Sequence, residues 1–117
     1  MKWFLIFLAC AGCKPSSDAP AGSGSAVPAM PASEVKRDQD ACKAYVDRVC
    51  ACAETTPAMK QPCAKARAFP DAMQVSLEIA ATPDSTRRDV RQAYDSVRNI
   101  ARKCIEETAR LPAAGCP

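Results

Sequence analysis

The stretch VRQAYDSVRNIARKCIEET, residues 90–108, decides the fold class of this chain. One set of residues recurs in it at steps of three and four, the spacing of an amphipathic helix. The members of this stripe are Val90, Ala93, Tyr94, Val97, Ile100, Ala101, Cys104, Ile105 and Thr108. Thr86 and Asp89 precede it with the spacing of a capping box in which Asp replaces Glu. We therefore expect a helix that begins after Thr86 and ends before the Leu111-Pro112 step.

Two further helices are predicted on the N-terminal side of this one, over residues 35–53 and 62–81. The stripe of the first consists of Cys42, Tyr45, Val46, Val49, Cys50 and Ala53, and Cys52 lies off it. Pro57 separates the two helices, because proline disfavours helix in the residue before it. The second carries Phe69, Ala72, Met73, Leu77 and Ala80 on one face, which Val75 and Ile79 widen. Pro70 predicts a kink or a break near Phe69.

Residues 34–117 offer little material for a large core. Their only aromatic residues are Tyr45, Phe69 and Tyr94, and they show no alternating run typical of strands. A domain of this size usually needs covalent reinforcement. The fold class predicted is all-α: a small three-helix bundle stapled by disulfides.

The N-terminal residues have the composition of a targeting segment. Lys2 precedes an apolar run, residues 3–9, and the sequence Cys10-Ala11-Gly12-Cys13 follows. This order of a positive residue, an apolar region and small residues is typical of a signal peptide. The apolar run is far shorter than the roughly 20 residues that cross a bilayer.

Cys10-Ala11-Gly12-Cys13 resembles the lipobox of bacterial lipoproteins, in which an aliphatic residue, a small residue and Gly or Ala precede the lipidated cysteine. Ala11, Gly12 and Cys13 match, and Cys10 occupies the aliphatic position. The resemblance implies cleavage before Cys13 and acylation of Cys13, so that the lipid bilayer is a partner. Lys14 stands where Asp would signal retention in the inner membrane. This implies the outer membrane, facing the periplasm or the cell surface, while modification of Cys10 or ordinary secretion stay open as alternatives.

The chain then divides into three parts. Residues 1–12 are the expected lipoprotein signal peptide, and residues 13–33 are the lipidated N-terminus with a flexible linker rich in Pro, Ser, Gly and Ala. Residues 34–117 are the cysteine-rich helical domain.

Cleavage and acylation would leave an even number of cysteines for disulfides: Cys42, Cys50, Cys52, Cys63, Cys104 and Cys116. Sequence alone permits fifteen pairings of six thiols. In an up-down-up bundle the end of the first helix, the start of the second and the end of the third meet. We expect Cys50 and Cys104 to face each other there, Cys52 to reach Cys63, and the returning tail to bring Cys116 to Cys42.

Charge and residue types exclude several function classes. Removal of a signal containing Lys2 leaves a formal charge of +2, so a dedicated nucleic-acid binder is not expected. The chain has no histidine, the usual general base, and its four glycines form no phosphate-binding loop. The short paired spacings of zinc sites are absent from the sequence as well. We expect no cofactor, no metal site and no catalytic residue.

The charged face of the last helix carries pairs four residues apart, namely Asp84 with Arg88, Arg91 with Asp95 and Arg102 with Glu106. A solvated surface is the favoured interpretation of this face, against a binding stripe for anionic headgroups or a partner.

These observations favour a non-catalytic binding or structural module of the cell envelope, not an enzyme, with a possible envelope protein as its partner. Two alternatives remain. One is a thiol-disulfide redox protein that uses Cys50 and Cys52, and the other is a secreted small disulfide-rich inhibitor or effector.

Overall fold

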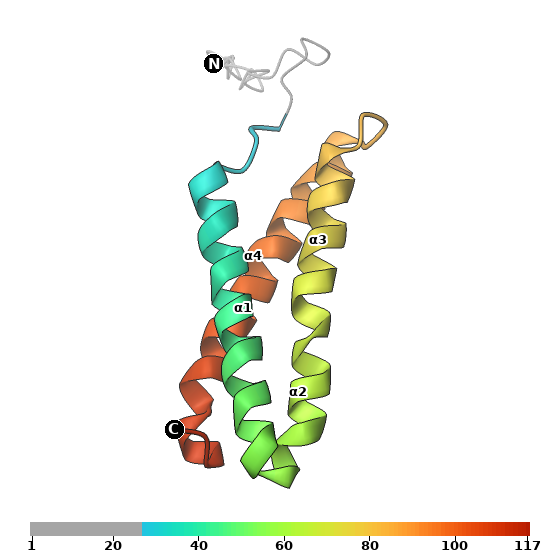
Figure 1. Cartoon of the computed structure of the whole chain (residues 1–117). Coiled ribbons are helices and arrows are strands. Elements are labelled where there is room, and N and C mark those ends of the chain that lie inside the picture. Colours follow the sequence, from blue (N-terminus) through green and yellow to red (C-terminus); the bar gives the residue numbers. More distant parts are fainter. Residues whose placement is uncertain (1–26) are drawn as a thin grey trace, which may run out of the picture.

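The computed structural model describes residues 27–117, and within them it is an all-α three-helix bundle without strands. The helix α1 spans Ala32–Thr55. A second arm returns through a 3-10 turn at Pro57–Met59, α2 at Lys60–Ala66 and α3 at Ala68–Ala81. The helix α4, Arg87–Arg110, then runs parallel to α1, and a 3-10 turn at Pro112–Ala114 begins the tail (Figure 1).

The folded domain begins earlier than residue 34. Met30, which was assigned to the linker 13–33, is buried in the core, and α1 begins at Ala32. The N–H groups of Glu34 and Val35 donate to the carbonyl of Pro31, at 2.9 and 3.0 Å. The last residues of the expected linker therefore belong to the domain, because they supply an apolar side chain and the first helical turn.

The second arm breaks close to the expected place. The break lies at Arg67, between α2 and α3, and Pro70 falls in the first turn of α3. In that position the N–H that proline lacks would have no partner within the helix. The arm also starts before residue 62, because Pro57 suits the first turn of a helical segment and opens the 3-10 turn.

The start of α4 is fixed by the predicted capping box. Thr86 Oγ1 accepts from the N–H of Asp89 at 3.1 Å, and the N–H of Thr86 donates to Asp89 Oδ2 at 3.0 Å. This hydrogen bonding with the side chain and backbone of Thr86 holds the pKa of Asp89 below its usual range. The reciprocal pair satisfies two backbone donors that the helix itself leaves unpaired.

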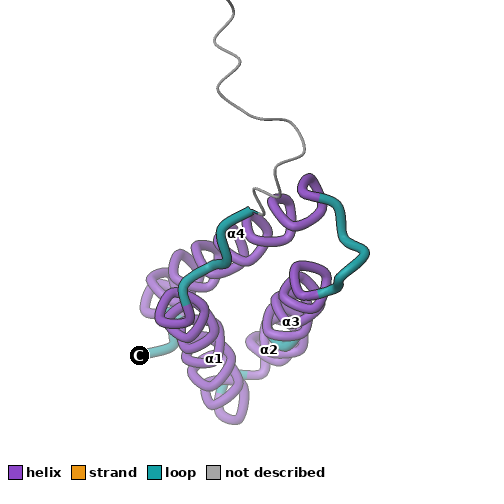
Figure 2. Tube along the Cα trace, turned by 90° about the horizontal axis from the view of Figure 1, so that it is seen from above, coloured by secondary structure: helices purple, strands orange, loops and turns teal. Residues whose placement is uncertain are grey.

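The core fills the space between the three arms, with α4 packed against both α1 and α3 (Figure 2). Its buried apolar members are Met30, Cys42, Tyr45, Val49, Ala53, Met59, Cys63, Ala66, Met73, Ala93, Val97, Ala101, Cys104, Leu111 and Cys116. Three large apolar residues of the predicted stripes are exposed: Val75 is 55% exposed, Ile79 43% and Ile105 57%.

All six cysteines of the described domain are paired, but the predicted pairing is wrong at each bridge. The bonds join Cys42 to Cys104, Cys50 to Cys63 and Cys52 to Cys116.

The error lies in the axial register, that is, in which residues of α4 lie beside which residues of α1. Contacts between these parallel segments have a nearly constant sequence separation: 64 for the ion pair of Glu34 with Arg98, 62 for Cys42 with Cys104 and 64 for Cys52 with Cys116. The expected bond of Cys50 to Cys104 would shift this register by about eight residues, or about 12 Å. Because the second arm already begins at Pro57, it is longer than predicted, and it carries the start of α4 past the start of α1 (Figure 1).

Tryptic mapping of the unreduced protein will distinguish the two pairings. The observed register predicts a species that joins residues 38–43 to residues 104–110, and a second that joins 49–60, 61–65 and 111–117. Fragmentation of the second species should assign Cys50 to Cys63 and Cys52 to Cys116. A linkage of residues 38–43 to 111–117 would instead contradict this register.

Loss of the cap should weaken the domain measurably. We expect Thr86→Ala to lower the free energy of unfolding in urea by about 1 kcal/mol at neutral pH, and Thr86→Ser to lower it less. Since the pKa of Asp89 is lowered in the folded state, the box contributes above the carboxylate's ordinary pKa and its contribution is lost as the pH falls. The difference between wild type and Thr86→Ala should therefore shrink in acid. Thr55→Ala, at an exposed helix end without a capping box, is the control.

Candidate functional site

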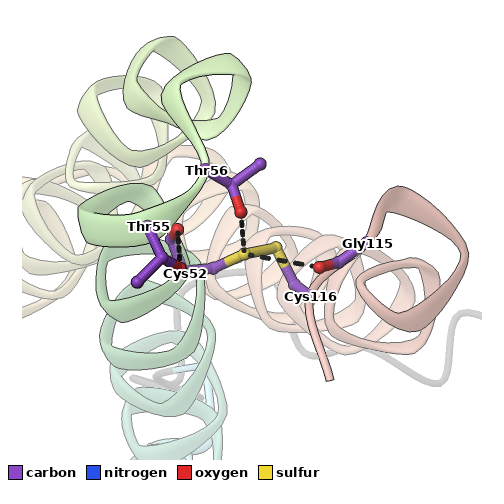
Figure 3. The surroundings of a disulfide bond; sticks show 5 residues. All are labelled: Cys52, Thr55, Thr56, Gly115 and Cys116. Carbon is purple, nitrogen blue, oxygen red and sulfur yellow. Dashed lines mark hydrogen bonds between the residues drawn. A yellow bond between two sulfur atoms is a disulfide. The ribbon is translucent and has the colours of Figure 1, made fainter.

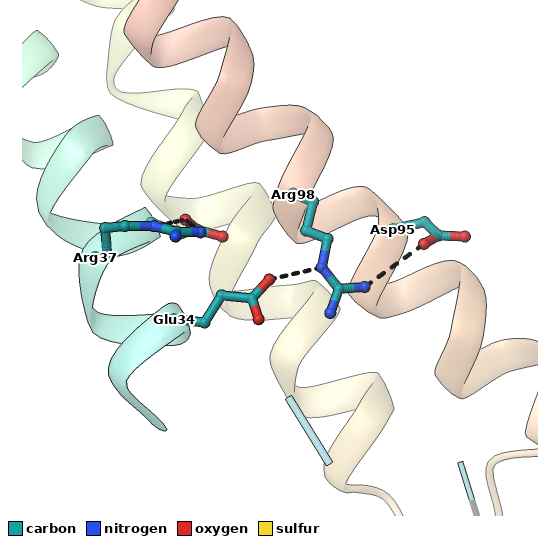
Figure 4. A network of polar contacts seen from close by, with 5 residues as sticks. Glu34, Arg37, Asp95 and Arg98 are labelled. Carbon is teal, nitrogen blue, oxygen red and sulfur yellow. Dashed lines mark hydrogen bonds and ion pairs between the residues drawn. The ribbon is translucent and has the colours of Figure 1, made fainter. Parts of the chain in front are cut away.

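The seam between α1 and α4 holds a row of polar side chains and a disulfide bond. Glu34, Asp38 and Cys42 recur every four residues along α1, so they face α4 as a row. At the upper end of the row, Arg98 Nε donates to Glu34 Oε1 at 2.7 Å (Figure 4). At the lower end, Cys42 is bonded to Cys104.

The ion pair at the upper end perturbs both of its members. The hydrogen bond from Arg98 holds the pKa of Glu34 below its usual range, and the same bond raises the pKa of Arg98. Asp95 adds a longer contact with Arg98, at 3.8 Å (Figure 4). Arg98 therefore stays charged and remains tied to α1.

Asp38 lies between these two cross-links and is only 3% exposed. Its Oδ1 accepts from the neighbouring Arg37, from Nε at 3.1 Å and from Nη2 at 2.9 Å. Within the part of the chain that the structure describes, its buried Oδ2 has no hydrogen-bond partner. Buried carboxylate oxygens are normally paired, so this one calls for a physical explanation.

A cleft of about 350 Å³ opens at this place. Its lining consists of Glu34, Arg37, Asp38, Arg98, Ala101, Arg102, Ile105 and Glu106. Three arginines and three carboxylates thus line the same cleft. Ala101 is the small residue of the lining, and Ile105 is exposed to solvent. Asp38 is not among the predicted site residues, although its position four residues before Cys42 places it on the buried stripe.

Two larger depressions lie on the other side of α1. One of about 600 Å³ adjoins the Cys50–Cys63 bond, where Lys60 and Arg67 face Asp47 and Glu54. Another, of about 440 Å³, lies between α1 and α3 above Met73. Both are open, and no unpartnered buried polar atom of the described residues lines them.

Cys50 and Cys52, the pair considered for redox chemistry, are bonded to different partners. Cys52 closes the tail through Cys116, and its Sγ lies 3.7 Å from Thr56 Oγ1 and 3.9 Å from the carbonyl oxygen of Gly115 (Figure 3). Gly115 has φ of 90°, a left-handed conformation that glycine adopts without strain and that turns the tail toward α1. The bonds place the two cysteines in separate links, so they do not form one dithiol pair.

The charged face of α4 forms contacts that differ from those predicted. Asp95 contacts Arg98, and Arg102 donates to Asn99. An i,i+4 ion pair of α4 joins Lys103 to Glu107 at 2.9 Å, and this interaction holds the pKa of Glu107 below its usual range. Solvated side chains four apart have several alternative partners, which is why spacing alone did not select them.

Among residues 27–117, no cluster of three or more His, Cys, Asp or Glu side chains is arranged to hold a metal ion. Nor is any helix in that range both long and apolar enough to cross a membrane. Cys13, the predicted lipidation site, and Cys10 lie outside the described residues.

Comparisons with protein-family models, with curated proteins and with solved structures find no match to this chain. Its function is therefore inferred from its own residues.

The ion pair of the seam gives a pH prediction. In an NMR titration of the side-chain carboxyl, Glu34 should titrate below the ordinary range, and Arg98→Gln should return it toward that range. Because the folded pKa is lowered, the pair stabilises the domain above the unfolded pKa of Glu34, and that stabilisation is lost as the pH falls. The stability difference between wild type and Arg98→Gln should thus narrow in acid. A titration of Glu34 that Arg98→Gln leaves unchanged would show that the pair does not form in solution.

Proposed function

We propose that this chain is a bacterial lipoprotein, acylated on Cys13, whose helical domain acts as a non-catalytic binding or structural module of the cell envelope. The lipid holds the domain at a membrane, which we assign to the outer membrane, on its periplasmic or outer face. An envelope protein is the expected partner.

The disulfide bonds are the observation that carries this proposal. All six cysteines of the domain are consumed in three bonds, which leaves only Cys10 and Cys13 of the eight. Disulfides persist in oxidising compartments such as the periplasm or the cell surface, and an exported chain with an odd free thiol is unfavourable there. Acylation of Cys13 and removal of Cys10 with the signal account for both remaining cysteines.

The start of the domain limits how far it can stand from the membrane. With Cys13 in the bilayer surface and Met30 in the core, about 16 residues separate the lipid from the fold. Even a fully extended chain of that length spans at most about 55 Å. Partners within reach are therefore membrane proteins, lipids or other molecules close to the surface.

A non-catalytic role is favoured by the chemistry of the side chains. The chain lacks histidine, and the thiols of the domain are committed to bonds between helices or between α1 and the tail. We therefore assign binding or structural work to the domain and no reaction.

Expression of the full chain in a Gram-negative bacterium tests the anchor. We expect the mature protein to begin at Cys13, to carry the added mass of acyl chains and to sediment with membranes. Cys13→Ala should abolish the acyl mass and release the protein from the membrane fraction, whereas Cys10→Ala should leave both unchanged.

The converse results identify the alternatives. A soluble mature protein without acyl chains would overturn the proposal in favour of secretion, and an acyl chain on Cys10 would overturn the assignment of Cys13. Counting free thiols on the unfolded, unreduced protein tests the redox alternative. The proposed binding or structural module should show no free thiol, whereas free thiols at Cys50 and Cys52 would favour the redox alternative.

A further inference from the structure

We propose that the cleft between α1 and α4 binds a primary ammonium group through Asp38, with the aliphatic stem of the ligand along Ala101 and Ile105. This inference goes beyond the proposed function and does not depend on acylation.

The unpartnered oxygen of Asp38 is the first reason. Asp38 is 3% exposed and lines the cleft, and its Oδ2 has no hydrogen-bond partner within residues 27–117. An ionised carboxylate can only accept hydrogen bonds, so the missing group is a donor. A buried acceptor without a partner raises the free energy of the folded state. A ligand that donates a hydrogen bond to it removes that desolvation penalty on binding.

The charges of the cleft lining balance, so the unpaired hydrogen-bonding group at its buried end decides which ligand fits. Arg98 is engaged by Glu34, and Arg37 is engaged by Asp38 Oδ1. Arg102, the third arginine of the lining, donates to the neutral Asn99 and stays available to an anionic group, whereas the buried acceptor without a partner among the described residues is Asp38 Oδ2. An ammonium group carries three donors and no acceptor, so it can donate to Asp38 Oδ2, which an ionised carboxylate or phosphate cannot do.

The cleft is held open by links on both sides. The Glu34–Arg98 pair lies one helical turn before Asp38, and the Cys42–Cys104 bond lies one turn after it. The residue across the seam is Ala101, whose small side chain cannot fill the space or donate to Asp38. The two cross-links fix the helix backbones on both sides of the cleft, so binding requires side-chain movement but no rearrangement of the helices.

The rim supplies an apolar surface and a movable side chain. Ile105 is 57% exposed beside the cleft and suits an alkyl stem. Arg102 donates to Asn99, a neutral partner, so it can swing aside without breaking an ion pair. Such movement matters because Asp38 Oδ2 is closed to water, and an incoming donor has to displace a lining side chain.

An ammonium group can come from a free alkylamine, from an amino acid or from a lysine side chain. These sources share the group that Asp38 would bind and differ in what accompanies it. An amino acid adds a carboxylate that Arg102 could pair with, whereas a blocked lysine adds peptide groups and a longer stem.

The test is an NMR titration of the oxidised full chain with Cys10→Ser and Cys13→Ser, which keep it free of lipid. Butylammonium should give saturable shifts in the amides of residues 34–42 and 98–106, and butyrate should not. Asp38→Asn should weaken the affinity at least about tenfold, as expected for a hydrogen bond to a charged group. The matched control, Asp40→Asn on the exposed side of α1, should change the affinity less than about twofold.

A second variant keeps the test independent of the stability of Asp38→Asn. Ile105→Ser alters only the exposed rim, and it should weaken butylammonium several-fold while leaving methylammonium unchanged. Among the sources, leucine binding that Arg102→Gln weakens would indicate an amino acid, and strongest binding of Nα-acetyl-lysine amide would indicate a lysine side chain. Shifts that do not saturate, that butyrate reproduces, or that Asp38→Asn leaves intact would overturn the proposal.

Discussion

The parallel register of α1 and α4 is the constraint on which the rest of the domain depends. Two disulfides and one ion pair fix it at three heights, at Glu34, Cys42 and Cys52, with nearly the same sequence separation each time. The third bond, Cys50 with Cys63, closes the hairpin between α1 and α2. Each bond stabilises a chain of this kind by about 2 to 4 kcal/mol, chiefly by restricting the unfolded state. A core with few aromatic side chains can therefore hold three helical arms in place.

The same register decides which residues meet across the seam. It sets Asp38 beside Ala101 rather than opposite an arginine, because Arg98 lies one turn earlier and is occupied by Glu34. The covalent bond one turn later prevents α4 from sliding to bring a donor opposite Asp38. The unpaired oxygen is thus a consequence of the way the helices are locked together, and local movement of side chains or a bound donor has to satisfy it.

Periodicity, capping and proline chemistry predicted much of this fold, because they depend on residues close in sequence. The stripe of Val97 and Cys104, the box of Thr86 with Asp89, and the break before Pro70 are all local signals. The axial register between two helices cannot be predicted in this way. The period of a helix indicates which face a residue occupies, but it does not indicate which residue of the neighbouring helix lies at the same level along the bundle. The cysteines were therefore assigned to buried faces correctly at Cys42 and Cys104, yet paired wrongly. Asp38 shows the same limit: its spacing from Cys42 places it on the buried stripe, but the groups that lie opposite it are not known until the register is known.

The cost of burying Asp38 also bears on why a domain this small relies on disulfides. A partly satisfied carboxylate in a protein interior lowers the stability of the folded state, and a small core has little stability in reserve. Disulfides supply stability that does not depend on filling the seam with apolar side chains, because they act largely on the unfolded chain. They allow the seam to stay polar and incompletely packed at Asp38 while the helices around it remain fixed. In this domain the disulfide bonds therefore supply stability that the polar seam does not. Because the helices stay fixed, the acceptor of Asp38 can remain buried and unpaired between them.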